Sequence, residues 1–210
     1  MNIELNRIKP TYMSEGEITP SDIYLCEKVL FEKGKKYLIK AQSGHGKTSF
    51  LNFIYGSSFH YEGSIKYDGV FNKKDIFEFR KNKLSYVFQD YKLFPSLTAY
   101  ENIQLKNDLT QYKTEQEINR LIDKVSLSHK RNTLVQNLSL GQRQRIAIIR
   151  ALCQPFDYLL LDEPFSHLDN KNIEILAEII GQELQNQGAG LIMTSLELSQ
   201  VFEFDKILNL

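Results

Sequence analysis

The sequence predicts an α/β fold with a parallel-sheet core, an N-terminal antiparallel β subdomain and an inserted helical subdomain. After Ala41, short apolar runs alternate with segments of helical periodicity, an order typical of a parallel sheet covered on both faces. Residues of about 90–140 show helical spacing and no strand pattern, which indicates the insertion. We expect a single domain over 1–210, with its core at about 1–89 and 155–210 and the helical subdomain at about 90–154.

The individual elements follow from periodicity and from residues that favour turns. Alternating or continuous apolar residues predict strands at Asn2–Ile8, Ile23–Phe31, Lys36–Ala41, Leu84–Phe88, Tyr158–Leu161, Leu191–Thr194 and Ile207–Leu210. The pair Asp68-Gly69 predicts a hairpin that joins Ser64–Tyr67 to Val70–Phe71. Helical spacing predicts helices at Lys47–Tyr55, Thr114–Val125, Gln142–Leu152 and from Asp169 through Leu184.

The segment 41–50, AQSGHGKTSF, follows an apolar strand and predicts a phosphate-binding loop. Gly44 and Gly46 let the backbone approach an anion, and the helix that begins at Lys47 adds the positive end of its dipole. Lys47 supplies a charge for the β- and γ-phosphates, and the Thr48 hydroxyl can bind Mg²⁺. The strict pattern has glycine where this chain has Ala41. The alternative is a strand–turn–helix corner with an incidental lysine.

Two adjacent carboxylates end the strand Tyr158–Leu161. Ligands gather at the carboxyl ends of parallel strands, so Asp162 is expected beside the phosphate loop, holding the Mg²⁺ shell. Glu163 can then act on an attacking water as a base or as a positioning group. Taken alone, the pair could equally be a strand end that meets solvent. The upstream Lys47 and Thr48 favour the functional interpretation.

Composition limits the classes of function. Lys and Arg number 26, as do Asp and Glu, so the formal net charge of zero argues against a nucleic-acid partner. No apolar run is long enough for a transmembrane helix, so a membrane role requires a partner. Cys26 and Cys153 lie far apart in the sequence, as is typical of a reduced, cytoplasmic setting.

The order of these motifs resembles the ATP-binding cassette (ABC) ATPases over nearly the whole chain. The most specific segment is Leu138–Ala147, LSLGQRQRIA, which is similar to the family's LSGGQ signature with Leu140 in place of the first glycine. Ser139 and Gln142 also form a capping-box pattern, so a well-capped helix start is the plainer interpretation. The resemblance implies that two chains sandwich two ATP molecules, with Ser139 and Gly141 reaching across to the partner's nucleotide.

The resemblance carries further roles onto single positions. It implies that Tyr12 stacks on the adenine and that Asp169 lies at the seam of the dimer. The full set of implied ATP-contacting residues is Tyr12, Ser43, Gly44, His45, Gly46, Lys47, Thr48, Ser49, Gln89, Ser139, Leu140, Gly141, Gln142 and Asp169. It implies Mg²⁺ ligation by Thr48, Gln89 and Asp162, and catalysis by Glu163, Gln89, Ser195 and Lys47. Tyr12 could also be an ordinary loop aromatic.

The resemblance also implies partners. Residues 93–102 are similar to the segment that contacts a membrane subunit, so we expect an integral membrane transport subunit to bind near 90–105. The resemblance also implies a second cassette subunit, either identical to this chain or different from it. A capped helix entry is the plainer interpretation of that segment. The loop Tyr12–Pro20 is similar to the lipoprotein-release and macrolide-export subgroup. The expected location is cytoplasmic, at the inner face of the membrane. A soluble cassette acting on DNA or translation, or a small-substrate kinase, fits the motifs less well.

Two departures from the family pattern bear on activity. The family places a histidine after threonine at the switch position, whereas this chain has Thr194-Ser195, and a serine can still donate one hydrogen bond. Leu140 places a side chain where a glycine would face the partner's nucleotide. We expect ATP hydrolysis to persist, since Lys47 and Glu163 are present; the alternative is an ATP-dependent switch that hydrolyses rarely. The sequence also lacks the family's usual tail after Leu210, either because the cassette is minimal or because the chain was cut there.

Overall fold

A five-stranded parallel sheet forms the middle of the computed structural model, which describes residues 1–18, 21–41, 46–70, 75–195 and 201–210. Every neighbouring pair in this sheet is parallel, as predicted. In spatial order the strands are β5 (Leu84–Val87), β6 (Tyr158–Asp162), β7 (Gly190–Ser195), β3 (Lys36–Lys40) and β8 (Lys206–Asn209).

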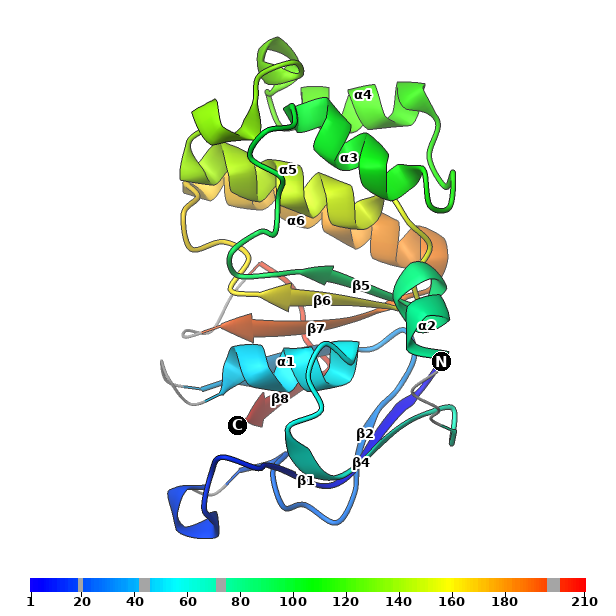
Figure 1. Cartoon of the computed structure of the whole chain (residues 1–210), viewed down its shortest axis with the longest axis vertical. Helices are drawn as coiled ribbons and strands as arrows, with labels where there is room; N and C mark the ends of the chain where they lie inside the picture. Colours follow the sequence, from blue (N-terminus) through cyan, green and yellow to red (C-terminus); the bar gives the residue numbers. More distant parts are fainter. Residues whose placement is uncertain (19–20, 42–45, 71–74, 196–200) are drawn as a thin grey trace.

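Successive side chains of the central strands enter two different hydrophobic clusters, one on each face of the sheet. Leu159 and Leu161 of β6 join the cluster beneath α5 (Leu140–Leu152) and α6 (Asn170–Gln187). Leu160 joins the cluster that includes α1 (Lys47–Tyr55). Figure 1 shows α5 and α6 on one side of the sheet and α1 on the other. This two-sided burial explains why the strands read as continuous apolar runs.

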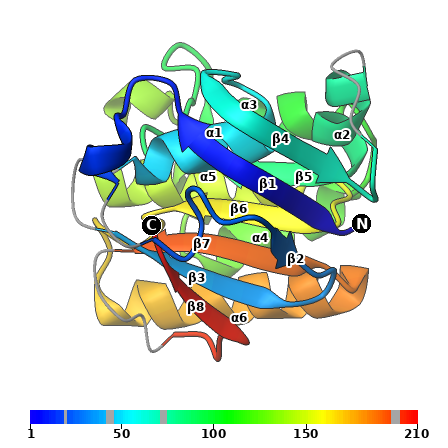
Figure 2. The ribbon, with the colours of Figure 1, turned by 90° about the horizontal axis from the view of Figure 1, so that it is seen from below.

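A smaller antiparallel sheet packs beyond α1, in the order β2 (Val29–Phe31), β1 (Ile3–Pro10) and β4 (Tyr61–Tyr67). Figure 2 shows β1 and β4 in front of α1. This arrangement confirms the predicted antiparallel β subdomain.

Two predictions in this region, one of a strand and one of a hairpin, differ from the structure. The strand expected over Ile23–Phe31 is confined to Val29–Phe31, because Leu25 has a left-handed φ of 61° and the Ser21 hydroxyl caps the chain just before it. The predicted hairpin is reduced to an isolated bridge between Tyr67 and Val70, since β4 takes β1 as its partner. Residue 71 lies outside the described part.

Helices fill the stretch between β5 and β6. Capping boxes at Thr98 and Thr114 begin α3 (Ala99–Asn107) and α4 (Glu115–Lys124). The last helix here, α5, begins at Leu140, two residues before the predicted start. A short helix that the sequence analysis missed, α2 (Ile76–Asn82), precedes β5. Short 3₁₀ turns occur at Glu15–Glu17, Ser128–Lys130 and Val135–Asn137. Among the described helices, none has the length and hydropathy needed to span a membrane.

Candidate nucleotide-binding site

The first helix begins where the sequence predicts a phosphate loop. Gly46 is the N-cap of α1 with a left-handed φ of 85°, which favours glycine. A Cβ there would lie 3.3 Å from the hydroxyl oxygen of Tyr24 and 4.0 Å from that of Tyr12. Tyr12, which is 58% exposed, therefore lies beside the start of α1. The predicted loop residues Ser43, Gly44 and His45 lie outside the described part of the chain.

Lys47 is buried at the start of α1 and connects the loop to the end of β6. Its Nζ donates a 2.9 Å hydrogen bond to the carbonyl of Ala41 and lies 3.2 Å from Oε1 of Glu163. Only 6% of the lysine side chain is exposed. The ammonium group is thus held next to the helix N-terminus, where a phosphate would meet both the lysine charge and the positive end of the helix dipole. Ser49 follows on the first turn of α1.

Three oxygen-bearing side chains from separate elements meet beside Lys47. The Thr48 hydroxyl donates to Oδ2 of Asp162 at 2.6 Å and lies 3.3 Å from the amide oxygen of Gln89. Burial raises the pKa of Asp162, and the neighbouring Glu163 raises it further, while hydrogen bonds from two threonines oppose the shift. Hydroxyl, amide and carboxylate oxygens are the ligands that Mg²⁺ accepts in proteins, so this set fits a magnesium ion.

Thr194, at the end of β7, is a site residue that the sequence analysis did not identify. Its hydroxyl donates to Oδ1 of Asp162 at 2.7 Å, and it also accepts the Glu163 N–H at 3.2 Å. The backbone of Glu163 has a φ of 48°, which is unusual for a residue other than glycine. Thr194 thereby orients the Asp162 carboxylate and holds the backbone of Glu163. The available signal was a polar, β-branched residue at the end of an apolar strand.

Ser195 is the last residue of β7 and pairs with Lys40 in the neighbouring β3. It is half-buried and lies directly after Thr194, at the edge of the sheet where Asp162 ends β6. The position therefore belongs to the carboxyl edge of the parallel sheet, as expected for ligand-facing residues.

The start of α5 confirms the predicted capping box. The Ser139 N–H donates to the Gln142 side chain at 3.0 Å, and the Gln142 N–H donates back to the Ser139 hydroxyl at 3.3 Å. Leu140 is 52% exposed at this helix start. The side chain of Gln144, one turn on, donates to the Pro164 carbonyl and accepts the His167 N–H, which ties α5 to the segment after Glu163.

Asp169 caps α6 by accepting the Asn172 N–H at 2.8 Å. This backbone hydrogen bond holds the pKa of Asp169 below its usual value. Asn172 in turn accepts a 3.0 Å hydrogen bond from Arg145 of α5. Asp169 is therefore connected to α5 through Asn172 and Arg145. Its expected contact with a partner cassette stays a prediction.

Gly141 is required by close packing. A Cβ there would lie 2.8 Å from the carbonyl oxygen of His167, closer than side chains normally come to backbone. Gly141→Ala is expected to push the start of α5 away from the segment after Glu163, to destabilise the fold by about 1–3 kcal/mol and to lower ATP turnover. Thermal unfolding and steady-state hydrolysis would measure both effects.

The matched control is Gly181→Ala, because this helical glycine on α6 has open space where the new methyl would lie. It should be neutral or stabilise by up to about 1 kcal/mol through helix propensity. Equal behaviour of the two variants would contradict the packing argument.

A phosphate-loop helix start, a strand-end Asp–Glu pair and oxygen ligands at one edge of a parallel sheet define a nucleoside triphosphate-binding protein of the P-loop class. The separate antiparallel sheet and the capped helix that begins at LSLGQ narrow this class to the ATP-binding cassettes. Residues 28–166 match the family described as ABC transporter. The chain belongs to the ABC transporter ATPase family.

Relatives in this family resemble the chain along most of its length. It is 34% identical over 172 residues to the uncharacterized ABC transporter ATP-binding protein YclH of Bacillus subtilis (strain 168), covering 80% of this chain and 76% of YclH. It is 31% identical to the lipoprotein-releasing system ATP-binding protein LolD of Buchnera aphidicola subsp. Schizaphis graminum, covering 92% and 86%.

The fold of this chain is also similar to that of solved ATP-binding cassettes. A dimeric post-hydrolysis state of the ATP-binding cassette MJ0796 bound to ADP and Pi has a TM-score of 0.75 and 27% identity, and the match covers 93% of this chain and 88% of that one. These comparisons confirm the expected fold and the expected family, including its resemblance to the lipoprotein-release type.

Proposed function

We propose that the chain is the ATP-hydrolysing subunit of a membrane transport complex, which it powers by closing with a second cassette on bound ATP. The observation that carries this proposal is the convergence of Lys47, Thr48 and Asp162 with Glu163 at one sheet edge. The ADP- and Pi-bound MJ0796 cassette is a dimer, which supports the same assembly here.

Each group has a role in this proposal. Lys47, which now contacts Glu163, would turn its charge toward the β- and γ-phosphates, and Thr48, Gln89 and Asp162 would hold Mg²⁺. When bound, Mg²⁺ neutralises developing phosphate charge. Released from Lys47, the Glu163 carboxylate orients the attacking water and accepts its proton. Ser139, at the start of α5, would complete the partner's site with its hydroxyl and the adjacent helix dipole.

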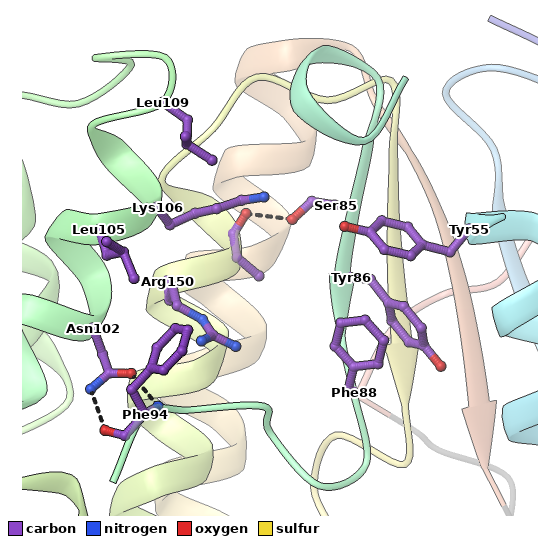
Figure 3. Close-up of a pocket in the computed structure, with 11 residues that line it drawn as sticks. Tyr55, Ser85, Tyr86, Phe88, Phe94, Asn102, Leu105, Lys106, Leu109 and Arg150 are labelled. Atoms are coloured by element: carbon purple, nitrogen blue, oxygen red, sulfur yellow. Dashed lines mark hydrogen bonds between the residues drawn. The ribbon is translucent and has the colours of Figure 1, made fainter. Parts of the chain in front are cut away.

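The membrane subunit is proposed to dock beside residues 90–105. The sequence predicts that the aromatic side chains Tyr91, Phe94 and Tyr100 form the docking surface. The structure corrects part of this prediction, because Tyr91 is buried and the ring centroid of Tyr100 lies 3.6 Å from the Arg131 guanidinium carbon. Phe94 is half-exposed and lines a groove of about 210 Å³ between α3 and β5 (Figure 3). Docking there would place the chain at the cytoplasmic face of the membrane.

Ser195 favours a second candidate function, an ATP-dependent switch with little hydrolysis. Wild-type protein with its membrane partner is expected to hydrolyse ATP measurably, and Ser195→His to be about tenfold faster or more. The reason is that one transition-state donor is worth about 100–1000-fold, of which a serine hydroxyl supplies only part. Steady-state phosphate release would measure both rates.

A Ser195→Ala variant is the control for this comparison, because it removes the hydroxyl and adds no new donor. It should be slower than wild type. If wild type shows no turnover while Ser195→His hydrolyses, the switch function replaces the transport ATPase function. If all three proteins release phosphate at one rate, position 195 has no role in the reaction.

A further inference from the structure

The hydroxyl group of Tyr86 is buried without a hydrogen-bond partner. Tyr86 belongs to β5, and only 6% of the residue is exposed. Within the described part of the chain, no donor or acceptor pairs with its hydroxyl oxygen. Most buried polar groups in folded proteins form at least one hydrogen bond, because leaving such a group unpaired costs free energy. The position of this hydroxyl therefore has to be explained.

The register of the sheet brings the Tyr86 side chain close to the end of β6. Tyr86 pairs with Leu160, and both side chains join the cluster on the α1 face of the sheet. Asp162 follows Leu160 by two residues, so its side chain lies on the same face, about 6.6 Å further along the strand. A tyrosine side chain can span such a distance. Figure 3 shows the Tyr86 ring directed along β5 toward Phe88, just past the carboxyl end of that strand.

Electrostatics places the same two groups near each other. Burial raises the pKa of Tyr86, and the charge of the Asp162 carboxylate raises it further. The carboxylate already accepts hydrogen bonds from Thr48 at Oδ2 and from Thr194 at Oδ1. Each carboxylate oxygen has two lone pairs, so Asp162 has the capacity to accept another donor.

Aromatic packing holds the Tyr86 ring in this direction. Its centroid lies 5.3 Å from that of Tyr55 on α1 and 4.0 Å from that of Phe88, which are contact distances for aromatic pairs. Tyr158 also has a buried hydroxyl without a partner in the described residues, but it begins β6, at the opposite edge of the sheet. Proximity to Asp162 is what distinguishes Tyr86.

We propose that Tyr86 is a positioning residue of the magnesium site, whose hydroxyl donates a hydrogen bond to the Asp162 carboxylate and accepts one from a water molecule bound to Mg²⁺. The inference rests on the magnesium site of the proposed function and adds a residue to it. Mg²⁺ in proteins usually keeps several waters, and residues that support its ligands strengthen its binding. A phenol can donate and accept at once, whereas a phenylalanine ring offers no such group.

The test measures how much Mg²⁺ strengthens ATP binding to the full chain. Equilibrium binding of ATP is measured with Mg²⁺ and with a chelator, in the Glu163→Gln background in which hydrolysis is slow. Adding Tyr86→Phe is expected to reduce the affinity gained from Mg²⁺ by about tenfold, the lower end of the range for losing a residue that supports a metal ligand. Affinity in the chelator should stay unchanged. A purely structural role of the hydroxyl would not alter the Mg²⁺-dependent gain alone.

Tyr158→Phe is the matched control, because it removes a second buried hydroxyl without a partner in the described residues. It should keep the full gain from Mg²⁺. Without nucleotide and Mg²⁺, both variants are expected to unfold at or slightly above the midpoint of the parent chain, since neither loses a hydrogen bond. A clearly lower midpoint for Tyr86→Phe would contradict the proposal, because its hydroxyl would then already be paired in the free chain.

Failure of the inference is distinguishable from failure of the proposed function. An unchanged gain from Mg²⁺ in Tyr86→Phe, or an equal loss in Tyr158→Phe, overturns the role of Tyr86 and leaves the magnesium site and the ATPase function standing. If ATP binding gains nothing from Mg²⁺ in the chain that keeps Tyr86, the magnesium site is contradicted, and the inference and the proposed mechanism fail with it.

Discussion

Glu163→Gln is expected to slow ATP hydrolysis by at least about 100-fold, the lower end of the range for losing a general base. Glutamine keeps the size of the side chain and removes the carboxylate that now lies 3.2 Å from Lys47. ATP should still bind, because the change also frees the Lys47 ammonium for the phosphates. Turnover by phosphate release and affinity by equilibrium binding would separate these effects.

Glu174→Gln serves as the matched control, since Glu174 is exposed on α6, away from the strand end. It should leave both quantities unchanged. Turnover by Glu163→Gln within a factor of about three of wild type would remove the carboxylate from the mechanism, and Asp162 or a water network would have to supply the base.

Asp162→Asn is expected to slow Mg²⁺-dependent hydrolysis by about 100-fold or more. It is also expected to make the nucleotide-free protein more stable. The two effects share one cause, which is that the carboxylate is buried and its pKa is raised. Asparagine removes a buried charge but is a weaker ligand for Mg²⁺. Each kcal/mol of stability should raise the midpoint by about 2–4 °C in a chain of this size.

The pH dependence gives this prediction a sign. Because the pKa of Asp162 is higher in the folded chain, the native state binds this proton more tightly than the unfolded state, and the contribution of Asp162 to stability falls as pH rises above about 4. The stability advantage of Asp162→Asn should therefore be largest near pH 7 and shrink toward pH 4. A variant less stable than wild type at pH 7 would show that the threonine hydrogen bonds outweigh burial.

Local sequence signals predicted those parts of the fold that depend on neighbouring residues. The helix Lys47–Tyr55 has the predicted bounds, and Asp169 caps α6 as expected, because caps and glycine turns act over a few residues. The parallel sheet followed from the alternation of strands with helices. The strand predicted over Ile23–Phe31 was wrong in its first part. The apolar composition favours a strand, but the Ser21 hydroxyl and the left-handed backbone of Leu25 form a turn there.

The candidate site was predictable only in part, because several of its contacts join residues far apart in the sequence. The position of Asp162 beside the start of α1 followed from two motifs that each point to a phosphate, whereas the ion pair of Lys47 with Glu163 was not predicted. The role of Thr194 depends on β7 lying beside β6, a sheet order that no local pattern specifies. The inward position of Tyr91 likewise depends on tertiary contacts, including its 3.0 Å hydrogen bond to His167.

The hydrogen bonds of Arg150 link the groove between α3 and β5 to the candidate nucleotide-binding site. Tyr91 and Lys92 both have left-handed backbone, and their carbonyls are fastened to α5 just past Gln89. A load applied in the groove would therefore be delivered within three residues to the amide oxygen beside Thr48. Through α5 the same load would reach the LSLGQ segment at the start of that helix. Under the proposed function, a force from the membrane subunit would therefore act on both halves of the nucleotide site that two cassettes form.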